Sequence, residues 1–338
     1  MSEQRPAPYL GRPGVAYFDV FNGDADGLCA LHQLRLHCPR DAALVTGVKR
    51  AIRLLDQVQA QAGDTVTVLD LSINANAAAL TDLLEKNVRV EWFDHHTSQP
   101  SPYETPLNHP LLRTTISSDP QVCTAALVDR RLDGRYRRWA IVAAYGDNLP
   151  RAARRLALSL QLPARERHAL ARLGTLLNYN AYGDHIDKLI IHPAELYLRL
   201  HRHLDPLMFS SVEPVLRKIS TTLQSDLQSA LAIPADKVAG GRVLYLPDAA
   251  WSRRVIGTLA NHLARDEPEL AHAVLVPASG KTWRVSVRAP LRTLRGADAV
   301  CLQFRSGGGR PTAAGIDALP DAERSSFIQQ FERQFGGA

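Results

Sequence analysis

The sequence predicts an α/β protein with a parallel-sheet N-terminal domain, a helical linker and a smaller α/β domain at the C-terminus. Three observations support this prediction. Strand-like and helix-like segments alternate over residues 15–150, a pattern typical of βαβ units. Arginine-rich helical patterns follow over residues 150–232, and strand patterns return after residue 240. The length of 338 residues suits two domains.

The first segments alternate between strands and helices. Residues 16–21 are an apolar run that predicts a buried strand, and residues 22–27 (NGDADG) have the composition of a turn. A helical pattern of leucines begins at Leu28. Two further strands are predicted at residues 65–72 and 87–96, and two helices at residues 51–62 and 75–86.

The second half of the chain changes composition twice. Residues 151–160 and 194–204 are helical, and residues 210–233 predict one long connecting helix with Pro214 near its start. The domain boundary is therefore expected between residues 205 and 236. Three strands of a new α/β unit are predicted at residues 240–248, 271–279 and 282–290.

Composition excludes several classes of protein. The chain has no apolar run of 18 residues, so we expect no membrane-spanning helix, and its first residues lack the apolar region of a signal peptide. Four cysteines are widely spaced, which argues against a disulfide framework or a thiolate zinc site and suits the cytoplasm. A formal charge of +6 is compatible with an anionic substrate.

Acidic and histidine residues stand at the ends of four separate predicted strands, the last of which ends at Asp147. In a parallel sheet the carboxyl ends of the strands lie at one edge, so we expect these residues to meet there. Each could be a turn residue, a helix cap or a chance surface group when taken alone, but together they suit a pair of Mn²⁺ or Mg²⁺ ions. The residues are Asp24, Asp26, Asp70, Asp94, His95, His96 and Asp147.

Such a pair of ions predicts phosphate chemistry. A shared carboxylate can bridge two ions roughly 3.5–4 Å apart. One ion would polarise a phosphoryl oxygen, while the pair would lower the pKa of a bridging water that attacks phosphorus in line.

The order Asp-x-Asp, Asp, Asp-His-His, Asp resembles the DHH phosphoesterase family, and FDHH at residues 93–96 matches its third motif. Near the other end, FRSGGGRPTAAGI at residues 304–316 is similar to the glycine-rich motif of the DHH-associated C-terminal domain. The resemblance covers residues 15–335. It implies a disordered lead-in (1–14), a metal-dependent catalytic domain (15–205), a linker helix (206–235) and a substrate-binding domain (236–338).

The resemblance also implies roles for individual residues. Asp24 and Asp26 would each bind one Mn²⁺, Asp70 would bridge the ions, and His95 and Asp147 would complete the ligand set. His96 would contact the substrate phosphate, and Asp94 would orient its neighbours. The catalytic residues implied in this way are Asp70, His95 and His96.

Two departures from the family pattern bear on these roles. Many relatives carry a histidine or aspartate just before the Asp-x-Asp pair, where this chain has Asn22, with Asp19 further upstream. Either the Asn22 oxygen or a water would then complete the first ion's shell. The C-terminal motif usually ends in histidine, where this chain has Arg310.

The glycine-rich segment has two interpretations. Gly307, Gly308 and Gly309 would let backbone N–H groups approach a phosphate closely, and Arg310 would add a charged fork. Arg288 would bind the same ligand from a neighbouring strand, with Arg305 as a third candidate. The alternative is a tight strand-to-helix turn with a solvated arginine.

The predicted function is a manganese-dependent phosphodiesterase that hydrolyses short oligonucleotides or small nucleotides in the cytoplasm. Short substrates are favoured because no further nucleic-acid-binding module is evident. The alternatives are a RecJ-like single-strand exonuclease, an exopolyphosphatase or pyrophosphatase, and a catalytically impaired nucleotide-binding protein. The sequence leaves open the physiological substrate, the cleavage polarity and the oligomeric state, a homodimer included.

Overall fold

A computed structural model describes residues 14–96 and 107–337. The chain divides into two compact units, Met1–Ile219 and Ser220–Ala338, each described by itself below. The division falls inside the long helix α9 (Pro214–Leu231). Apart from Gly14, the predicted lead-in lies outside the described residues.

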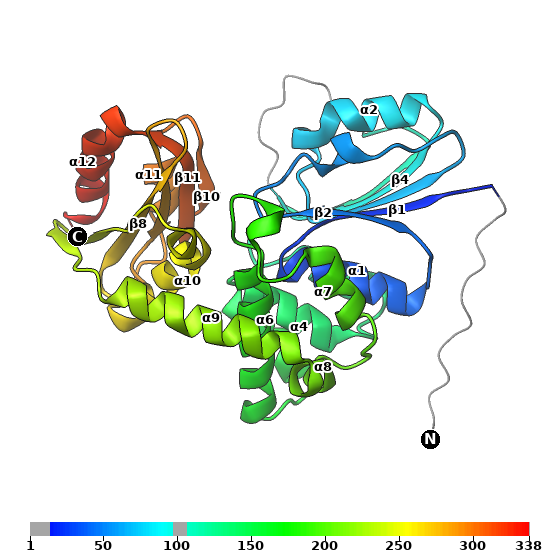
Figure 1. Cartoon of the computed structure of the whole chain (residues 1–338), viewed down its shortest axis with the longest axis horizontal. Coiled ribbons are helices and arrows are strands. Elements are labelled where there is room, and N and C mark those ends of the chain that lie inside the picture. Colours follow the sequence, from blue (N-terminus) through cyan, green and yellow to red (C-terminus); the bar gives the residue numbers. More distant parts are fainter. Residues whose placement is uncertain (1–13, 97–106, 338) are drawn as a thin grey trace. The chain divides into compact units, whose positions relative to one another are not determined.

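The first unit is built on a five-stranded sheet in which every pairing is parallel (Figure 1). The strand order is β2-β1-β3-β4-β5, so β1 lies between β2 and β3. This arrangement confirms the predicted parallel sheet. The strands are β1 (Tyr17–Asn22), β2 (Ala43–Gly47), β3 (Thr65–Leu69), β4 (Arg89–Asp94) and β5 (Leu112–Ile116).

Helices cover both faces of this sheet. Helix α2 (Ala77–Glu85) lies over one face, and α1 (Ala25–His37) lies on the other with further helices behind it (Figure 1). Val20, Val66 and Val68 pack with Leu80 and Leu84 in the core under α2. The remaining helices of this unit are α3 (Thr124–Arg131), α4 (Arg137–Gly146), α5 (Pro150–Ser159), α6 (Ala164–Asn180), α7 (Pro193–Leu200) and α8 (Pro206–Val212), with 3₁₀ turns at Leu54–Gln57, Asn74–Asn76 and Ile186–Lys188.

Two predicted helices are wrong in extent. Residues 51–62 contain only the 3₁₀ turn Leu54–Gln57, because the side chain of Asn76 takes backbone groups that a helix would need. Its Nδ2 donates to the carbonyl of Ile52 at 2.7 Å, and its Oδ1 accepts from the N–H of Leu55 at 3.3 Å. The helix predicted over 210–233 is broken at Glu213, whose backbone is extended, because the following Pro214 disfavours a helical conformation there.

The second unit contains a mixed six-stranded sheet in the order β10-β11-β9-β8-β7-β6, in which only β7 and β8 pair in parallel. One face packs against α11 (Ala297–Cys301) and α12 (Arg324–Phe335) through a core that includes Phe327 and Phe331. Helix α10 (Ala250–Asp266) packs on β8 and β9. The strands are β6 (Asp236–Val238), β7 (Gly241–Tyr245), β8 (Ala271–Ala278), β9 (Thr282–Arg288), β10 (Gly307–Arg310) and β11 (Ala313–Pro320), with a 3₁₀ turn at Asp321–Glu323.

Within residues 14–96 and 107–337, no helix has the length and apolar character needed to cross a bilayer.

Candidate metal centre

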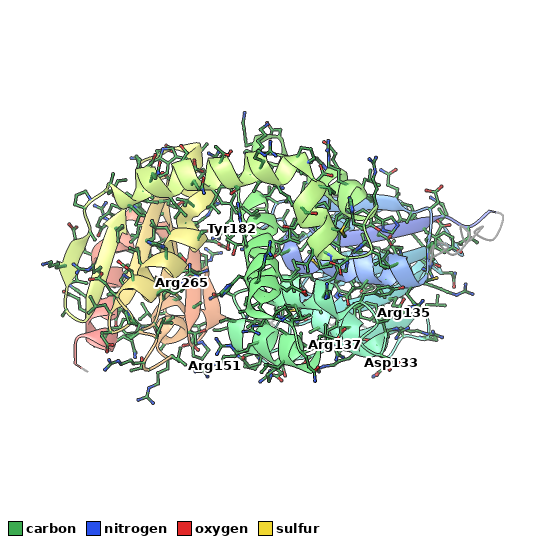
Figure 2. The ribbon with its side chains drawn as sticks, turned by 90° about the horizontal axis from the view of Figure 1, so that it is seen from below. Asp133, Arg135, Arg137, Arg151, Tyr182 and Arg265 are labelled. Carbon is green, nitrogen blue, oxygen red and sulfur yellow. The ribbon has the colours of Figure 1, made fainter. Side chains whose placement is uncertain are left out.

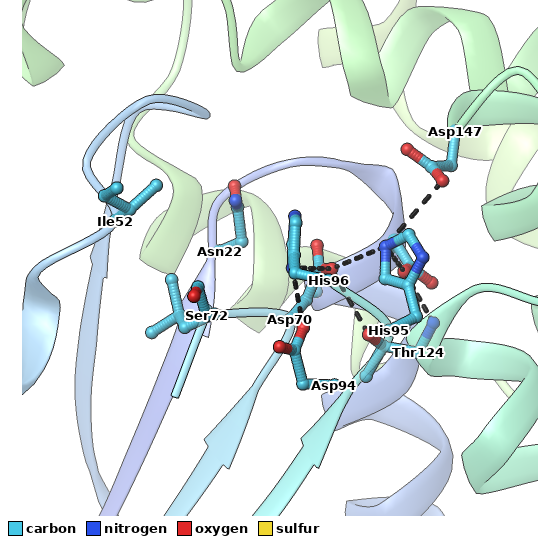
Figure 3. Close-up of polar contacts among 12 residues, drawn as sticks. Asn22, Ile52, Asp70, Ser72, Asp94, His95, His96, Thr124 and Asp147 are labelled. Atoms are coloured by element: carbon cyan, nitrogen blue, oxygen red, sulfur yellow. Dashed lines mark hydrogen bonds and ion pairs between the residues drawn. The ribbon is translucent and has the colours of Figure 1, made fainter. Parts of the chain in front are cut away.

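The polar residues singled out in the sequence gather at the carboxyl ends of three adjacent strands. Strand β1 pairs with β3, and β3 pairs with β4, so the residues that follow these strands are brought side by side. Asp24 and Asp26 follow β1, Asp70 follows β3, and His95 follows β4. Figure 3 shows this edge of the sheet, where open α/β folds commonly bind ligands.

The turn after β1 leads directly into α1. Asp24 is the N-cap of this helix, and its Oδ1 accepts from the N–H groups of Asp26 at 2.9 Å and Gly27 at 3.2 Å. Gly27 lies within the helix. A Cβ at this position would stand 2.1 Å from the carbonyl oxygen of Asn22, so glycine is required by the close approach of helix and strand.

Asp26 connects the first turn of α1 to the start of α3. Its Oδ2 accepts from the N–H of Thr124 at 2.7 Å, and its Oδ1 accepts from the N–H of Ala125 at 2.8 Å. The carboxylate thereby occupies the N-terminus of α3, where unpaired N–H groups stabilise negative charge. Burial nevertheless raises the pKa of Asp26, because it outweighs the nearby His95 charge and these hydrogen bonds.

Asp70 has a left-handed backbone conformation, with φ of 60°, at the end of β3. Aspartate tolerates this conformation better than most residues, and the N–H of Asp70 donates to the carbonyl of Phe93 at 2.9 Å. The side chain turns into the site, where Oδ1 accepts from the Thr124 hydroxyl at 3.2 Å. Burial, followed by the charges of Asp26 and Asp24, raises the pKa of Asp70 well above its usual range.

His95 is the centre of the cluster. Its Nε2 lies 3.3 Å from Asp70 Oδ1, 3.6 Å from Asp26 Oδ2 and 3.8 Å from Asp147 Oδ2. Figure 3 shows His95 between Asp70 and Asp147. Burial lowers the pKa of this imidazole, but the hydrogen bond with Asp70 and the surrounding carboxylate charges outweigh burial and raise it to about 10. The surrounding carboxylates therefore favour the protonated form of this imidazole.

His96 differs from His95 in exposure and partner. Its side chain is 42% exposed, and its Nδ1 lies 2.6 Å from Oδ1 of the buried Asp94. Because a carboxylate oxygen only accepts, Nδ1–H donates to Asp94 and Nε2 is left for another partner. Asp94 thus contacts and orients His96.

Asp147 reaches the cluster from a helix. The sequence places it after a strand, but residues 137–146 form α4, and Asp147 is the C-cap residue of that helix. The prediction of a strand end is wrong here because the run WAIVAA is a buried helix segment, which apolar composition alone does not distinguish from a buried strand.

Sequence reasoning missed Lys49. This residue follows β2, and its Nζ forms an ion pair with Asp24 Oδ2 and lies 3.8 Å from Asp147 Oδ1. Burial raises the pKa of Asp24, but the charge and hydrogen bond of Lys49 outweigh burial and lower it. One sequence signal could have identified Lys49. This residue follows the apolar run ALVTG, which forms β2, in the same way that the other site residues follow their strands.

Asn22 and Asp19 have other partners. Asn22 Nδ2 donates to the carbonyl of Lys49 at 3.1 Å, and its Oδ1 accepts from the N–H of Asp24 at 3.3 Å. Asp19 is buried in an ion pair with Arg35, which also donates to the Thr67 hydroxyl. Asn22 therefore supports the backbone around Asp24, and Asp19 stabilises the packing of α1 on the sheet.

The glycine-rich segment forms an edge strand, β10, instead of the tight turn that was the alternative interpretation. Two of its three glycines meet packing or backbone requirements. A Cβ on Gly307 would stand 1.7 Å from the carbonyl oxygen of Cys301, and Gly309 has φ of 138°. These positions demand glycine whether or not a ligand binds there.

Arg288 and Arg310 occupy the same level of the second sheet. Ala313 of β11 pairs with Arg310 on one side and Arg288 on the other, so the side chains of both arginines leave the sheet on the same face. Arg288 donates through Nε to Asn261 Oδ1 at 2.6 Å and through Nη1 to Ser286 Oγ at 3.0 Å. The substrate-binding roles of Arg288, Arg310 and the glycines stay predictions.

The donors at the first sheet edge fit a divalent cation. Asp70, His95 and His96 each offer a ligand atom, and these atoms lie within 4.8 Å of one another. The oxygens of Asp26 and Asp147 near His95 add to a mixed carboxylate and imidazole set that suits Mn²⁺. A second ion at Asp24 would instead meet the Lys49 ammonium.

Comparisons with known proteins find similarity in structure alone. No family model matches the sequence, and no curated protein does. RecJ from Thermus thermophilus, solved in complex with Mn²⁺, is 21% identical with a TM-score of 0.61 over 96% of this chain. A manganese-bound exonuclease RecJ is 22% identical with a TM-score of 0.55, over 95% of this chain and 90% of that one.

A third neighbour is a smaller enzyme. The pGpG-specific phosphodiesterase PggH from Vibrio cholerae is 14% identical with a TM-score of 0.52, and the match covers 94% of this chain and 99% of that one. By contrast, the chain spans 52% of the Thermus RecJ. These likenesses show that the protein has the fold shared by RecJ and PggH.

Proposed function

We propose that the protein is a divalent-cation-dependent phosphodiesterase that hydrolyses short oligonucleotides or small nucleotides. The observation that carries the proposal is the convergence of three carboxylates on one imidazole. Oxygens of Asp26, Asp70 and Asp147 lie within 3.8 Å of His95 Nε2, at the ligand-binding edge of a parallel sheet. Buried carboxylates gathered this closely repel one another, and a cation relieves that repulsion.

Asp26, Asp70, His95 and Asp147 would hold the ion. When bound, a divalent cation supplies positive charge against phosphoryl oxygens and acidifies water. Mn²⁺ is the favoured ion because the ligand set is mixed carboxylate and imidazole and because the two RecJ neighbours are manganese complexes. The second Mn²⁺ predicted at Asp24 has Lys49 as a competitor, and Mg²⁺ stays an alternative.

His96 is the residue placed to act on the substrate. Asp94 fixes Nδ1–H, so the partly exposed ring directs Nε2 to an external group. In its protonated form His96 would donate to a phosphate oxygen or to the departing alkoxide oxygen. Arg288 and Arg310 of the second unit are the proposed phosphate-binding side chains, with the glycines of β10 beside them.

The match to the pGpG-specific phosphodiesterase supports short substrates, because it extends over 94% of this chain and 99% of that one. One of the RecJ neighbours also matches over 90% of its length, so experiment must separate the exonuclease alternative. The polyphosphate, exonuclease and binding-protein alternatives from the sequence are separated by experiment. The cytoplasmic location and a homodimer stay predictions.

The test is hydrolysis by the purified chain in Mn²⁺ with and without a chelator. The substrates are two- to five-nucleotide oligomers, a cyclic dinucleotide, a long single strand and polyphosphate. We expect the two- to five-mers to be cleaved fastest and the chelator to abolish cleavage.

Each other outcome has a distinct meaning. Faster cleavage of the long strand would indicate an exonuclease, and preference for polyphosphate would indicate a phosphoanhydride hydrolase. No metal-dependent cleavage of any substrate by protein that binds Mn²⁺ would contradict an enzymatic function on these phosphate esters and anhydrides.

A further inference from the structure

Lys49 is fixed at the candidate centre by its backbone as well as its side chain. Its N–H donates to the carbonyl of Ala181 at 2.9 Å, and its carbonyl accepts from Asn22 Nδ2 at 3.1 Å. These bonds attach the loop after β2 to the end of α6 on one side and to the end of β1 on the other. The position of the ammonium is therefore determined by the fold.

The ammonium has two hydrogen-bond acceptors and a further carboxylate nearby. Nζ donates to Asp24 Oδ2 and to Asn178 Oδ1, the latter at 3.1 Å, and Asp147 Oδ1 lies 3.8 Å away. Nζ also lies 5.9 Å from the ring centroid of Tyr182, which is labelled in Figure 2. The side chain is 24% exposed, so a solvent-accessible part of it remains.

The carboxylates of the site divide between two side chains, Lys49 and His95. Asp24 uses Oδ1 to cap α1 and Oδ2 to bind Lys49, whereas Asp26, Asp70 and Asp147 place oxygens around His95. Asn22 is the side chain that the sequence offered to complete an ion shell at Asp24, and its amide already bonds to two backbone groups, which leaves only a water for that place. A divalent ion on Asp24 would displace Lys49 or lie against a like charge.

We infer that the centre binds one divalent cation, at Asp26, Asp70, His95 and Asp147, and that the Lys49 ammonium takes the place of a second ion beside Asp24. This inference rests on the proposed function and refines it, because it replaces the two-ion centre predicted from the sequence by one ion and one lysine. Lys49 neutralises Asp24 without a metal and presents a fixed positive charge at the rim of the site.

The experiment measures how many Mn²⁺ ions bind to the full chain. Calorimetric titration gives the stoichiometry, and electron paramagnetic resonance separates isolated ions from spin-coupled pairs. We expect one Mn²⁺ per chain without spin coupling. Two coupled ions per chain would overturn the inference while leaving metal-dependent hydrolysis intact, and no bound ion would overturn it together with the proposed metal dependence.

Two matched variants distinguish the role of the Asp24 carboxylate from that of Asp147 in binding the ion. Asp24→Asn retains an N-cap residue and removes none of the proposed ligands, so one ion per chain should still bind. Asp147→Asn should weaken binding at least about tenfold, because it removes a ligand. Loss of an ion in Asp24→Asn would contradict the inference. Circular dichroism of both variants checks that they are folded.

A third variant tests the lysine directly. Lys49→Met keeps the length of the side chain and removes its charge, so Asp24 becomes available and a second, weaker Mn²⁺ should bind with spin coupling. A Lys49→Met protein that binds one ion with unchanged affinity and hydrolyses substrate at the original rate would overturn the role of the ammonium.

Discussion

The two sheets carry their polar residues differently. In the first unit, the buried Asp26 and Asp70 and the partly exposed Asp147 direct oxygens toward His95, and the packing provides no apolar reason for this arrangement. In the second unit, Gly307 is explained by its contact with Cys301, and Arg288 is bonded to Asn261 and Ser286. Charged side chains that lie this close together destabilise the fold unless a ligand compensates them, so they indicate a functional site. A glycine motif, in contrast, can be required by packing alone.

The largest expected effect on activity comes from changing a carboxylate of the cluster around His95. Asp70→Asn keeps the shape of the side chain, and asparagine tolerates the left-handed backbone at this position. We expect kcat to fall at least about a thousandfold, because the cluster loses a central negative charge. Steady-state kinetics with a dinucleotide substrate measures this fall in kcat.

Asp82→Asn is the matched control, since it makes the same change on the exposed face of α2. Equal losses of activity in the two variants would contradict the assignment of Asp70.

The next effect concerns the packing role of the glycines. Gly307→Ala places a Cβ 1.7 Å from the carbonyl of Cys301 and should lower the free energy of unfolding by about 3 kcal/mol. Gly280→Ala in the same unit has open space but φ of 69°, and should cost about 1 kcal/mol. Urea denaturation measures both. If Gly307→Ala is as stable as Gly280→Ala, the packing explanation is wrong.

Substrate binding by the second unit predicts a smaller effect. Arg310→Gln should raise KM about tenfold with little change in kcat, because the arginine would contribute a charge-assisted bond to a phosphate remote from the reacting bond. Arg333→Gln, on the exposed side of α12, serves as the comparison. An unchanged KM in Arg310→Gln would leave the glycine-rich strand with packing as its only supported role.

The pKa of His95 predicts how Mn²⁺ binding depends on pH. The pKa is about 10 without metal, so at neutral pH an ion must displace a proton from Nε2. Affinity should therefore rise with pH, by about tenfold per unit below pH 10, and each ion should release at least about one proton. Calorimetry in two buffers of different ionisation enthalpy measures this release. Binding without proton release would contradict His95 as a ligand.

Sequence reasoning located β1, β3 and β4 because short apolar runs followed by polar residues are local signals. The same reasoning predicted that Asp24, Asp26, Asp70 and His95 meet, since parallel strands share an edge. Asp147 was expected at this edge as well, but the helix that positions it was mistaken for a strand.

Lys49 was missed for a different physical reason. Its side-chain partners Asp24 and Asn178 are 25 and 129 residues away in the chain, so no local pattern relates them. The hydrogen bonds of Asp26 to Thr124 and Ala125 are likewise long-range. Contacts of this kind depend on how the helices pack, which a single sequence does not specify.

The most direct test of the central claim is the initial rate of dinucleotide hydrolysis as a function of Mn²⁺ concentration, starting from chelator-treated protein. We predict no turnover without the ion, saturation as Mn²⁺ binds, and loss of turnover in Asp70→Asn at every concentration. Full turnover by the metal-free protein, or an Asp70→Asn variant as active as the original chain, would contradict a cation-dependent centre at this edge of the sheet.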